Sequence, residues 1–336
     1  MRIAVWYEGP SLGRNDGNPL YVTSFLKRIQ FFHDRFEKRV LNHRLLNHFP
    51  YGVEKDTTTE AIARHFYDKF GYIEVEHIRP YGENNHIFGR FDLHIWVDWG
   101  EDALTELLGY KPIYPPGRPL AYWASDTHLG YDYRLSCAKQ ADFVFAAQED
   151  AVEKFKLEGI DAVWLPHAFE PQAYPVFDLA SKRYDVCFVG HVNSENRIDA
   201  LDKLFREFPN FFYGQRRFEQ ASRKYAESKV VFNIAMKDDL NMRVFETLGS
   251  KSFLLTDRVQ SIEKLFVDGK HLVLYNNLDE MVDKARYFLA HDDLRDSIAK
   301  SGYKEVLKNH TFANRVEKIL ETCFSEKCNK KEFVCQ

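Results

Sequence analysis

The stretch NMRVFETLGS (241–250) places an arginine and a glutamate among apolar residues that follow a helical period. Arg243 and Glu246 lie three positions apart, so they share one face of the expected helix, for which Asn241 can serve as the N-cap. A cation in the first turn opposes the helix dipole unless an anion lies nearby. The spacing fits either an anionic ligand or an ordinary solvated helix pair, and both interpretations stay open.

A second carboxylate precedes Glu246 by eight residues. Asp238 lies in the segment MKDDL after the apolar run KVVFNIA, and we expect it in a loop at the end of a strand. Arginine pairs well with phosphates, and an ionised carboxylate can accept hydrogen bonds from two adjacent ribose hydroxyls. Arg243 and Glu246 therefore fit a nucleotide sugar better than a bare phosphate, with Asp238 beside them as a candidate catalytic residue.

Another turn, GHVNSENR (190–197), also follows an apolar run. Gly190 ends the expected strand, and Asn193 or Ser194 can cap the next helix. A glycine beside a helix N-terminus leaves backbone N–H groups open to an anion, and Arg197 can add a guanidinium to the same phosphate. The turn is neither GxGxxG nor a P-loop, so an ordinary βα turn with a surface arginine is the alternative.

The elements that must position these residues are short apolar runs alternating with amphipathic, helix-length runs. This alternation predicts α/β architecture, with two Rossmann-like, doubly wound parallel sheets covered by helices on both faces. Strands are expected at 2–7, 72–78, 92–97, 120–124, 142–147, 162–166, 184–190, 210–214, 229–235, 252–256 and 271–275. Helices are expected at 19–32, 57–70, 101–109, 148–158, 195–207, 217–227, 241–249, 260–266, 277–290, 292–308 and 312–325.

The segment PHAFEPQAYPVFD (166–178) contains three prolines and no clear period, which favours a seam between two domains. We therefore divide the chain into an N-terminal domain at 1–170, a C-terminal domain at 171–305 and a final helix with its tail at 306–336. Ligands of open parallel sheets bind beyond the carboxyl ends of the strands, so the segments that follow the strands are the candidate sites.

In the C-terminal half, one such segment contains Tyr213 and Gly214, which could border a base pocket, although tyrosine is more often a core residue. In the N-terminal half, AYWASDTHLGYDYR (121–134) contains Asp126 and His128. Histidine can hold a sugar hydroxyl or act as a base near neutral pH, and a loop histidine with an ordinary hydrogen bond is the alternative. The loops at 8–19 and 98–102 are weaker candidates for the acceptor side.

Composition excludes several classes of protein. The 336 residues carry a formal net charge of −4, which does not indicate a nucleic-acid partner. No apolar run approaches the roughly 20 residues of a membrane span, and MRIAVWYEG has the pattern of a first strand instead of a signal peptide, so we expect a cytoplasmic protein without an integral membrane segment. Of five cysteines, Cys137 and Cys187 have core patterns; the other three crowd into the tail, where a zinc site is a weak alternative.

Residues from Tyr184 to about Leu320 resemble the C-terminal domain of GT-B glycosyltransferases, and more narrowly the CgeB-like spore-maturation group related to the retaining GT4 class. The resemblance is carried by YDVCFVGHVNSENRIDAL, FFYG, KVVFNIAMKDDLNMRVFETLGSKSFLLTD and DGKHLVLYNNLDEMVDKARYFLAHDDLRDSIAKSGYKEVLKNHTFANRV. It implies a GT-B fold, with two Rossmann-like domains facing a cleft and a C-terminal helix that crosses back. It also implies that the N-terminal domain binds the acceptor and the C-terminal domain the donor.

The resemblance further implies individual roles. Retaining GT-B enzymes bind the donor with two acidic residues eight positions apart, which fall on Asp238 and Glu246. Many GT4 enzymes have glutamate at the first position. Arg197 and Arg243 would contact the diphosphate, and Gly249 would close the helix as a C′ residue. The stripe of Phe312, Val316 and Leu320 would be a packing face of the returning helix.

The resulting hypothesis is a glycosyltransferase that moves a sugar, most simply from a UDP-sugar, to a hydroxyl of a protein, glycan or small molecule. Retention of configuration follows from the resemblance alone. No cofactor and no metal are expected, because the two aspartates of MKDDL lack the spacer of a DxD motif. The alternatives are a nucleotide-sugar epimerase of the same fold and a non-catalytic spore or envelope assembly protein. A nicotinamide-dependent Rossmann enzyme is a third alternative, which the absence of a GxGxxG motif disfavours.

Overall fold

The structure is a computed structural model that describes residues 1–7, 65–66, 68–78, 91–97, 115, 117–179, 181–192 and 194–324. The chain divides into an N-terminal unit, Met1–Leu165 with Arg315–Gln336, and a C-terminal unit, Pro166–Asn314. The helices expected at 19–32 and 101–109 and the loops at 8–19 and 98–102 lie outside the described residues.

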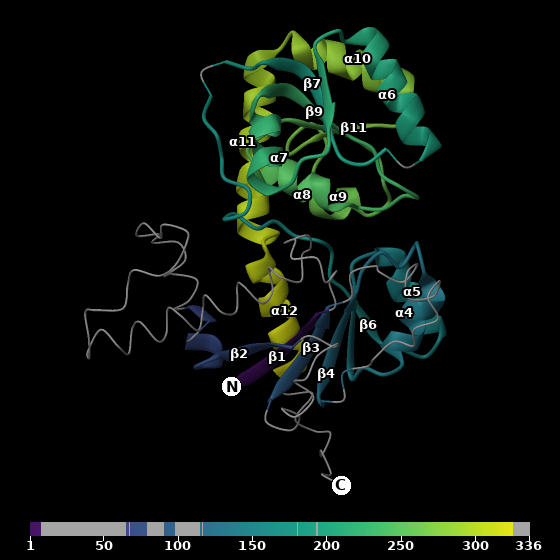
Figure 1. The fold of residues 1–336 in the computed structure, drawn as a ribbon, viewed down its shortest axis with the longest axis vertical. Helices are drawn as coiled ribbons and strands as arrows, with labels where there is room; N and C mark the ends of the chain where they lie inside the picture. Colours follow the sequence, from purple (N-terminus) through teal and green to yellow (C-terminus); the bar gives the residue numbers. More distant parts are fainter. Residues whose placement is uncertain are drawn as a thin grey trace, which may run out of the picture. The chain divides into compact units, whose positions relative to one another are not determined.

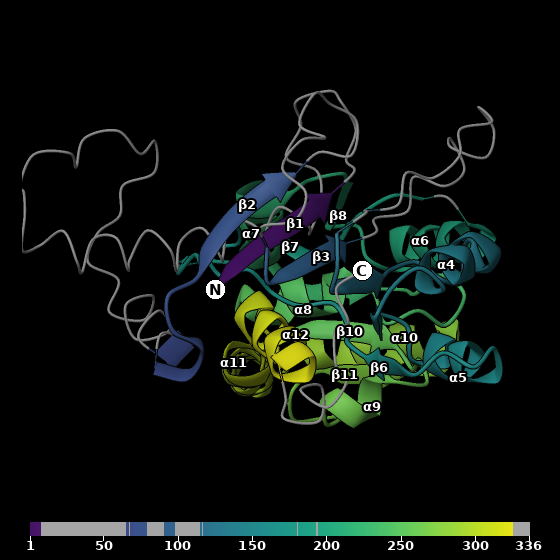
Figure 2. The same ribbon diagram turned by 90° about the horizontal axis from the view of Figure 1, so that it is seen from below.

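The N-terminal unit is built on a parallel sheet in the order β2-β1-β3-β4-β5-β6. Figure 2 shows β2, β1 and β3 side by side with their arrows pointing the same way. Both faces of β3 and β4 are buried, as expected for strands between two helical layers. The strands are β1 (Arg2–Tyr7), β2 (Glu74–Ile78), β3 (Leu93–Val97), β4 (Leu120–Ala124), β5 (Phe143–Ala146) and β6 (Ala162–Trp164).

Two helices of this unit follow strands β4 and β5. Helix α5 (Glu149–Leu157) was expected from the sequence, whereas α4 (Tyr131–Ala138) was not. Helix α4 has no side-chain cap at Gly130, and its buried face includes Arg134. A charged residue on the inner face breaks the apolar period from which helices are predicted, which explains the miss.

The C-terminal unit contains a second parallel sheet in the order β11-β10-β9-β7-β8. Its strands are β7 (Tyr184–Val189), β8 (Phe211–Gly214), β9 (Ser228–Asn233), β10 (Leu254–Asp257) and β11 (Val273–Tyr275). The chain leaves β7 toward β8 on one side and later returns to β9 on the other. The switch in strand order therefore falls between β7 and β9, where the carboxyl ends open a crevice for ligands in sheets of this kind.

Helices cover both faces of this sheet. Helices α6 and α10 lie together on one side, and α7, α8 and α11 lie on the other (Figure 1). Phe188 and Phe232 of the sheet and Met281 of α10 belong to the core between the sheet and the first pair. The helices are α6 (Glu195–Glu207), α7 (Phe218–Ala226), α8 (Met242–Gly249), α9 (Ile262–Leu265), α10 (Leu278–Leu289) and α11 (Asp292–Asn309).

The last described helix, α12 (Phe312–Phe324), belongs to the N-terminal unit from Arg315 onward. The expected packing stripe is confirmed, because Phe312, Val316 and Leu320 are buried. On its outer side, Glu317 pairs with Lys69 at 2.7 Å and with His65 at 2.8 Å. The return of the final helix to the N-terminal unit, expected from the resemblance, is thus confirmed from Arg315 onward.

The prediction that Gly249 closes α8 as its C′ residue is wrong. Helix α8 includes Gly249 as its last residue, Ser250 is the C-cap, and Lys251 takes the left-handed conformation with φ of 57°. A Cβ built on Gly249 would lie 2.3 Å from the ring of Phe169. The glycine therefore permits close packing of that ring against α8 and does not supply a helix-ending backbone conformation.

None of the described helices is both long enough and apolar enough to cross a bilayer. Cys137 and Cys187 are fully buried, as their sequence patterns predict, and two of the three tail cysteines lie outside the described residues.

Candidate functional site

The candidate site of the C-terminal unit lies at the switch between β7 and β9. Gly190 follows β7, Ile234 follows β9, and α8 begins after the loop that β9 leads into. Sequence positions that lie more than 40 residues apart thus meet at the carboxyl ends of two neighbouring strands.

Arg243 is the central cation of this site. Its Nη1 donates to Oδ1 of Asn233 at 2.6 Å, and its guanidinium carbon lies 4.5 Å from the centroid of the Phe188 ring. Asn241 caps α8 by accepting the backbone N–H of Arg243 at 3.1 Å, as expected. A Cβ built on Gly190 would lie 1.9 Å from Nη2 of Arg243. Gly190 is therefore required for the guanidinium to lie across the end of β7.

Arg197 supports the same region from α6. Its guanidinium donates to the carbonyl of Ile234 through Nη2 at 3.1 Å and to the carbonyl of His191 through Nη1 at 3.2 Å. Only 7% of Arg197 is exposed. Burial, aided by the positive charge of Arg243, lowers the pKa of Arg197 to about 10, which still leaves it charged at neutral pH. Arg197 therefore joins the two loops and adds positive charge behind Arg243.

Glu246 lies one turn after Arg243 on α8 and is half-buried. Its Oε1 accepts a hydrogen bond from the hydroxyl of Tyr174, and its Oε2 accepts one from Tyr225 at 3.4 Å. Burial raises the pKa of Glu246, while the bond from Tyr174 and the charge of Arg243 act in the opposite direction. The expected Arg–Glu face of α8 thus forms, with both charged groups held by neighbours.

Three other residues that the sequence singled out lie in the segments after β7 and β9, and the structure describes two of them. Asp238 is exposed, has a left-handed backbone with φ of 60°, and accepts the backbone N–H of Gln260 at 3.2 Å. Ser194 occupies the N-cap position of α6 without a side-chain capping bond. Asn193 lies outside the described residues.

Tyr213 and Gly214 end β8, which pairs with β7 on the side opposite β9. Tyr213 is 42% exposed, so it is not the core residue that the alternative required. The carbonyl of Gly214 accepts the backbone N–H of Gly190 at 3.2 Å. This bond places Gly214 next to the residue over which Arg243 lies.

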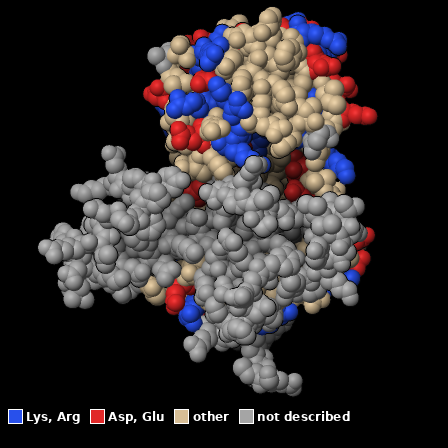
Figure 3. Space-filling view, in the orientation of Figure 1, with Lys and Arg blue, Asp and Glu red and all other residues tan. Residues whose placement is uncertain are grey.

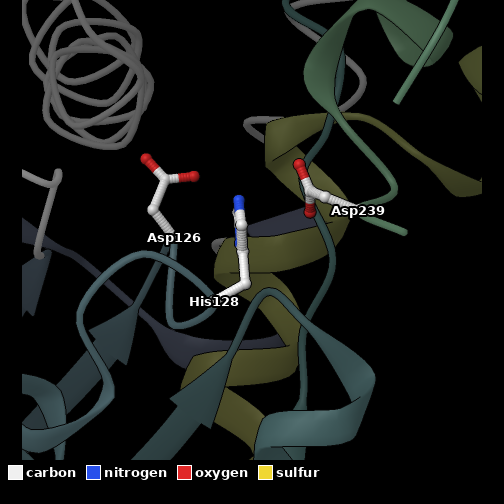
Figure 4. Close-up of side chains that lie close together, drawn as sticks. All are labelled: Asp126, His128 and Asp239. Carbon is white, nitrogen blue, oxygen red and sulfur yellow. The ribbon is translucent and has the colours of Figure 1, made fainter. Parts of the chain in front are cut away.

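In the N-terminal unit, the loop after β4 carries Asp126 and His128. Both side chains leave the loop on the same side (Figure 4). Asp126 has φ of 51°, and its carbonyl accepts the N–H of Leu129 at 2.9 Å, which closes a tight turn around His128. Figure 4 also labels Asp239, which belongs to the loop after β9 in the C-terminal unit.

This loop is braced from two helices. The carboxamide oxygen of Gln148, the N-cap residue of α5, accepts both the N–H and the hydroxyl of Thr127 at 3.1 Å. Arg134 of α4, which is 1% exposed, donates to the carbonyls of Ser125 and Gly130. The unpredicted helix α4 therefore fixes the backbone that presents Asp126 and His128.

Three residues of the C-terminal site were not predicted from the sequence. Asn233, Tyr174 and Tyr225 bind Arg243 or Glu246 directly. Asn233 has a signal in the sequence, because it is the uncharged polar residue inside the apolar run KVVFNIA. The two tyrosines have none, since their hydroxyls could be assigned only after the segment 166–183 and α7 were placed against α8.

Comparison with solved structures identifies the fold as GT-B. The chain is similar to HepE of Anabaena in complex with UDP and glucose, with 13% identity and a TM-score of 0.58 over 96% of this chain and 99% of that chain. It is also similar to a sucrose-phosphate synthase of Thermosynechococcus elongatus (10% identity, TM-score 0.55, 96% and 99% covered). A third similar structure is a glycosyltransferase of Rickettsia africae (11% identity, TM-score 0.55, 98% and 99% covered).

Within that fold, residues 184–321 match the family described as glycosyl transferase-like. The matched part begins at β7 and runs into α12, so it contains Gly190, Arg197, Arg243 and Glu246. No curated protein sequence matches the chain significantly.

Proposed function

We propose that the protein is a glycosyltransferase that binds a nucleoside-diphosphate sugar, most simply a UDP-sugar, in its C-terminal unit. One observation carries the proposal: Arg243 and Glu246 lie on one face of α8 at the switch point of the sheet, with Gly190 leaving room for the guanidinium. The family match over the same residues and the presence of UDP in the similar HepE structure support it.

In this proposal, Arg243 contacts the diphosphate, and Arg197 adds positive charge behind it. Transfer of the sugar places negative charge on the leaving diphosphate, and fixed cations in a half-buried site stabilise that charge without reorganisation. Glu246 accepts the ribose hydroxyls. Asp238 is the candidate for contact with the transferred sugar, and Tyr213 and Gly214 border the base.

Positive charge also gathers on the surface of the C-terminal unit, after β8 and along α7. Lys and Arg side chains gather on the part of the C-terminal unit where Figure 1 draws α7 (Figure 3). Arg216, Arg217 and Arg223 are exposed there, directly after β8 and along α7. Such a field raises the local concentration of an anionic donor.

We assign the acceptor to the N-terminal unit. His128 is the candidate base that takes the proton of the acceptor hydroxyl, and Asp126 is the candidate for its orientation. A protein, glycan or small-molecule acceptor, a retained anomeric configuration, independence of metal and a cytoplasmic location are further parts of this proposal, as is membership of the CgeB-like group.

The test is calorimetric titration with UDP and GDP. We expect UDP to bind the wild type, and we expect Arg243→Ala and Glu246→Ala to weaken it by at least about tenfold, because each removes hydrogen bonds to a charged group. Lys300→Ala, an exposed position on α11, is the matched control and should bind normally. Failure of both nucleotides to bind the wild type at millimolar concentration would sink the proposal.

Two additional experiments test independence of metal and the epimerase alternative. Equal UDP affinity and equal transfer in magnesium and in EDTA are expected, and loss in EDTA would overturn independence of metal. An NMR time course with donor sugar alone should show slow hydrolysis at most. Conversion of the sugar to its epimer without an acceptor would identify the epimerase alternative.

A further inference from the structure

Glu246 is held by two phenols that come from different parts of the C-terminal unit. Tyr174 lies in the segment between β6 and β7, and Tyr225 lies on α7. Their hydroxyls donate to opposite oxygens of the carboxylate, Tyr174 to Oε1 and Tyr225 to Oε2 at 3.4 Å. Tyr174 is 5% exposed and Tyr225 is 1% exposed. The carboxylate is therefore fixed from both ends by buried donors.

Tyr174 is itself held in position by its neighbours. The carbonyl of the next residue, Pro175, accepts a hydrogen bond of 2.5 Å from the fully buried hydroxyl of Ser222 on α7. The Tyr174 ring lies 6.0 Å from the ring of Phe169 and 6.0 Å from that of Phe218. These contacts tie the segment after β6 to the helices beside the site, so the position of the phenol does not depend on Glu246 alone.

The Glu246 carboxylate can accept more hydrogen bonds than the two tyrosines donate to it. An ionised carboxylate offers about four lone-pair sites, two on each oxygen. One site on each oxygen is taken by a tyrosine, and one on each oxygen remains. The remaining sites, one on each oxygen, lie in the plane of the carboxylate, whose orientation the tyrosines fix. They match two adjacent hydroxyl groups, which a ribose supplies at its 2′ and 3′ positions.

The phenols also act on the charge of Glu246. Burial raises the pKa of this carboxyl, and the hydrogen bonds from Tyr174 and Tyr225 oppose that shift, together with Arg243. Without these bonds, the pKa of Glu246 would rise further, and its protonated form would persist to a higher pH. A protonated carboxyl has one acceptor fewer and cannot receive both hydroxyls equally well.

We propose that Tyr174 and Tyr225 are positioning residues that orient the Glu246 carboxylate for a vicinal diol and so make the site selective for ribonucleotides over 2′-deoxyribonucleotides. The inference rests on the proposed function, because it assigns the residues that prepare the nucleotide site. It goes beyond that function by excluding deoxynucleoside-diphosphate sugars as good donors.

The experiment compares UDP with 2′-deoxy-UDP by calorimetry on the full chain. The wild type should bind UDP at least about tenfold more tightly, because a site built to bond a hydroxyl rejects a ligand that lacks it. Tyr174→Phe should weaken UDP by about three- to tenfold and leave 2′-deoxy-UDP nearly unchanged, so that the preference shrinks. Tyr225→Phe should act in the same direction. Tyr287→Phe, an exposed tyrosine of α10, should retain the full preference.

A pH series gives the readout that a purely structural role would not move. Since Tyr174→Phe removes a bond to the ionised carboxylate, UDP binding should weaken at a higher pH in this variant than in the wild type as the solution is acidified. Thermal melting checks that each variant folds, and Tyr174→Phe suffices if Tyr225→Phe unfolds.

The outcomes distinguish this inference from the proposed function. A wild type that binds neither UDP nor GDP removes both. A wild type that binds UDP and 2′-deoxy-UDP equally removes the inference only. It also fails if folded Tyr174→Phe keeps the wild-type preference and the wild-type pH profile.

Discussion

His94 gives the N-terminal unit a dependence on pH that can be calculated. This histidine of β3 is 1% exposed, and its Nδ1 accepts a hydrogen bond from the indole N–H of Trp6 at 2.9 Å. The indole is only a donor, so Nδ1 must be unprotonated in the folded unit. Gly117 lies against the ring, where a Cβ would come within 2.0 Å of it, and Phe91 meets its edge. A proton on His94 would break the bond to Trp6 and leave a buried charge.

Burial, and to a smaller extent the positive charge of Arg118, lowers the pKa of His94 from 6.5 to about 4. In the unfolded chain, His94 therefore binds a proton below pH 6.5, whereas in the folded unit it binds one only near pH 4. The stabilisation is fully present above pH 6.5 and is lost as the pH falls toward 4. These two values correspond to a loss of about 2 kcal/mol in the free energy of unfolding between pH 7 and pH 5, and about 3 kcal/mol by pH 4.

Tryptophan fluorescence can follow this unit selectively, because all five tryptophans of the chain fall within residues 1–165. Urea unfolding at pH 7 and pH 5 is compared for the wild type, His94→Asn and His291→Asn. Asparagine can still accept the Trp6 N–H but does not titrate, so His94→Asn should be less stable at pH 7 and lose about 2 kcal/mol less on acidification. His291, which is exposed on the C-terminal unit, is the control. A His94→Asn variant with the same pH dependence as the wild type would refute the reasoning.

Two further substitutions test the C-terminal unit. Gly302→Ala on α11 places a Cβ 2.3 Å from the carbonyl oxygen of His271, and this overpacking should cost about 1–3 kcal/mol in thermal or urea unfolding followed by circular dichroism, whereas Ser301→Ala should be nearly neutral. Equal stability of both variants would contradict the packing. Gly190→Ala must displace the guanidinium of Arg243, so UDP affinity should fall at least about tenfold. Because Gly190 has φ of 158°, an alanine there is also strained, so the melting temperature should fall as well, and circular dichroism must show that the variant is folded. Normal UDP binding by a folded Gly190→Ala variant would separate Arg243 from the diphosphate.

The periodicity of the sequence predicted the sheets well because parallel strands are buried on both faces and produce continuous apolar runs. Segments such as YDVCFVG and KVVFNIA could hardly form anything else, and their observed strands end within two residues of the expected ends. Asn241 was also predictable as a cap, because the capping bond to Arg243 is local in sequence.

The site was predictable only in part. The shared face of Arg243 and Glu246 follows from helical geometry, and their place after a strand follows from the α/β pattern. The sequence could not show that Arg197 donates to the carbonyls of His191 and Ile234, because the second of these lies 37 positions away. It equally could not predict that Gly249 serves a contact with Phe169, which depends on how the segment after β6 packs.

The sequence by itself determined which segments are strands and helices, which of them alternate, and which charged residues share a helical face. These features depend on interactions over a few residues and on the burial of apolar side chains. Only the tertiary structure decided which strands are neighbours at the switch point and which buried donors hold Glu246. Those contacts join positions 21 to 72 residues apart, and no local pattern encodes a partner that distant in the chain.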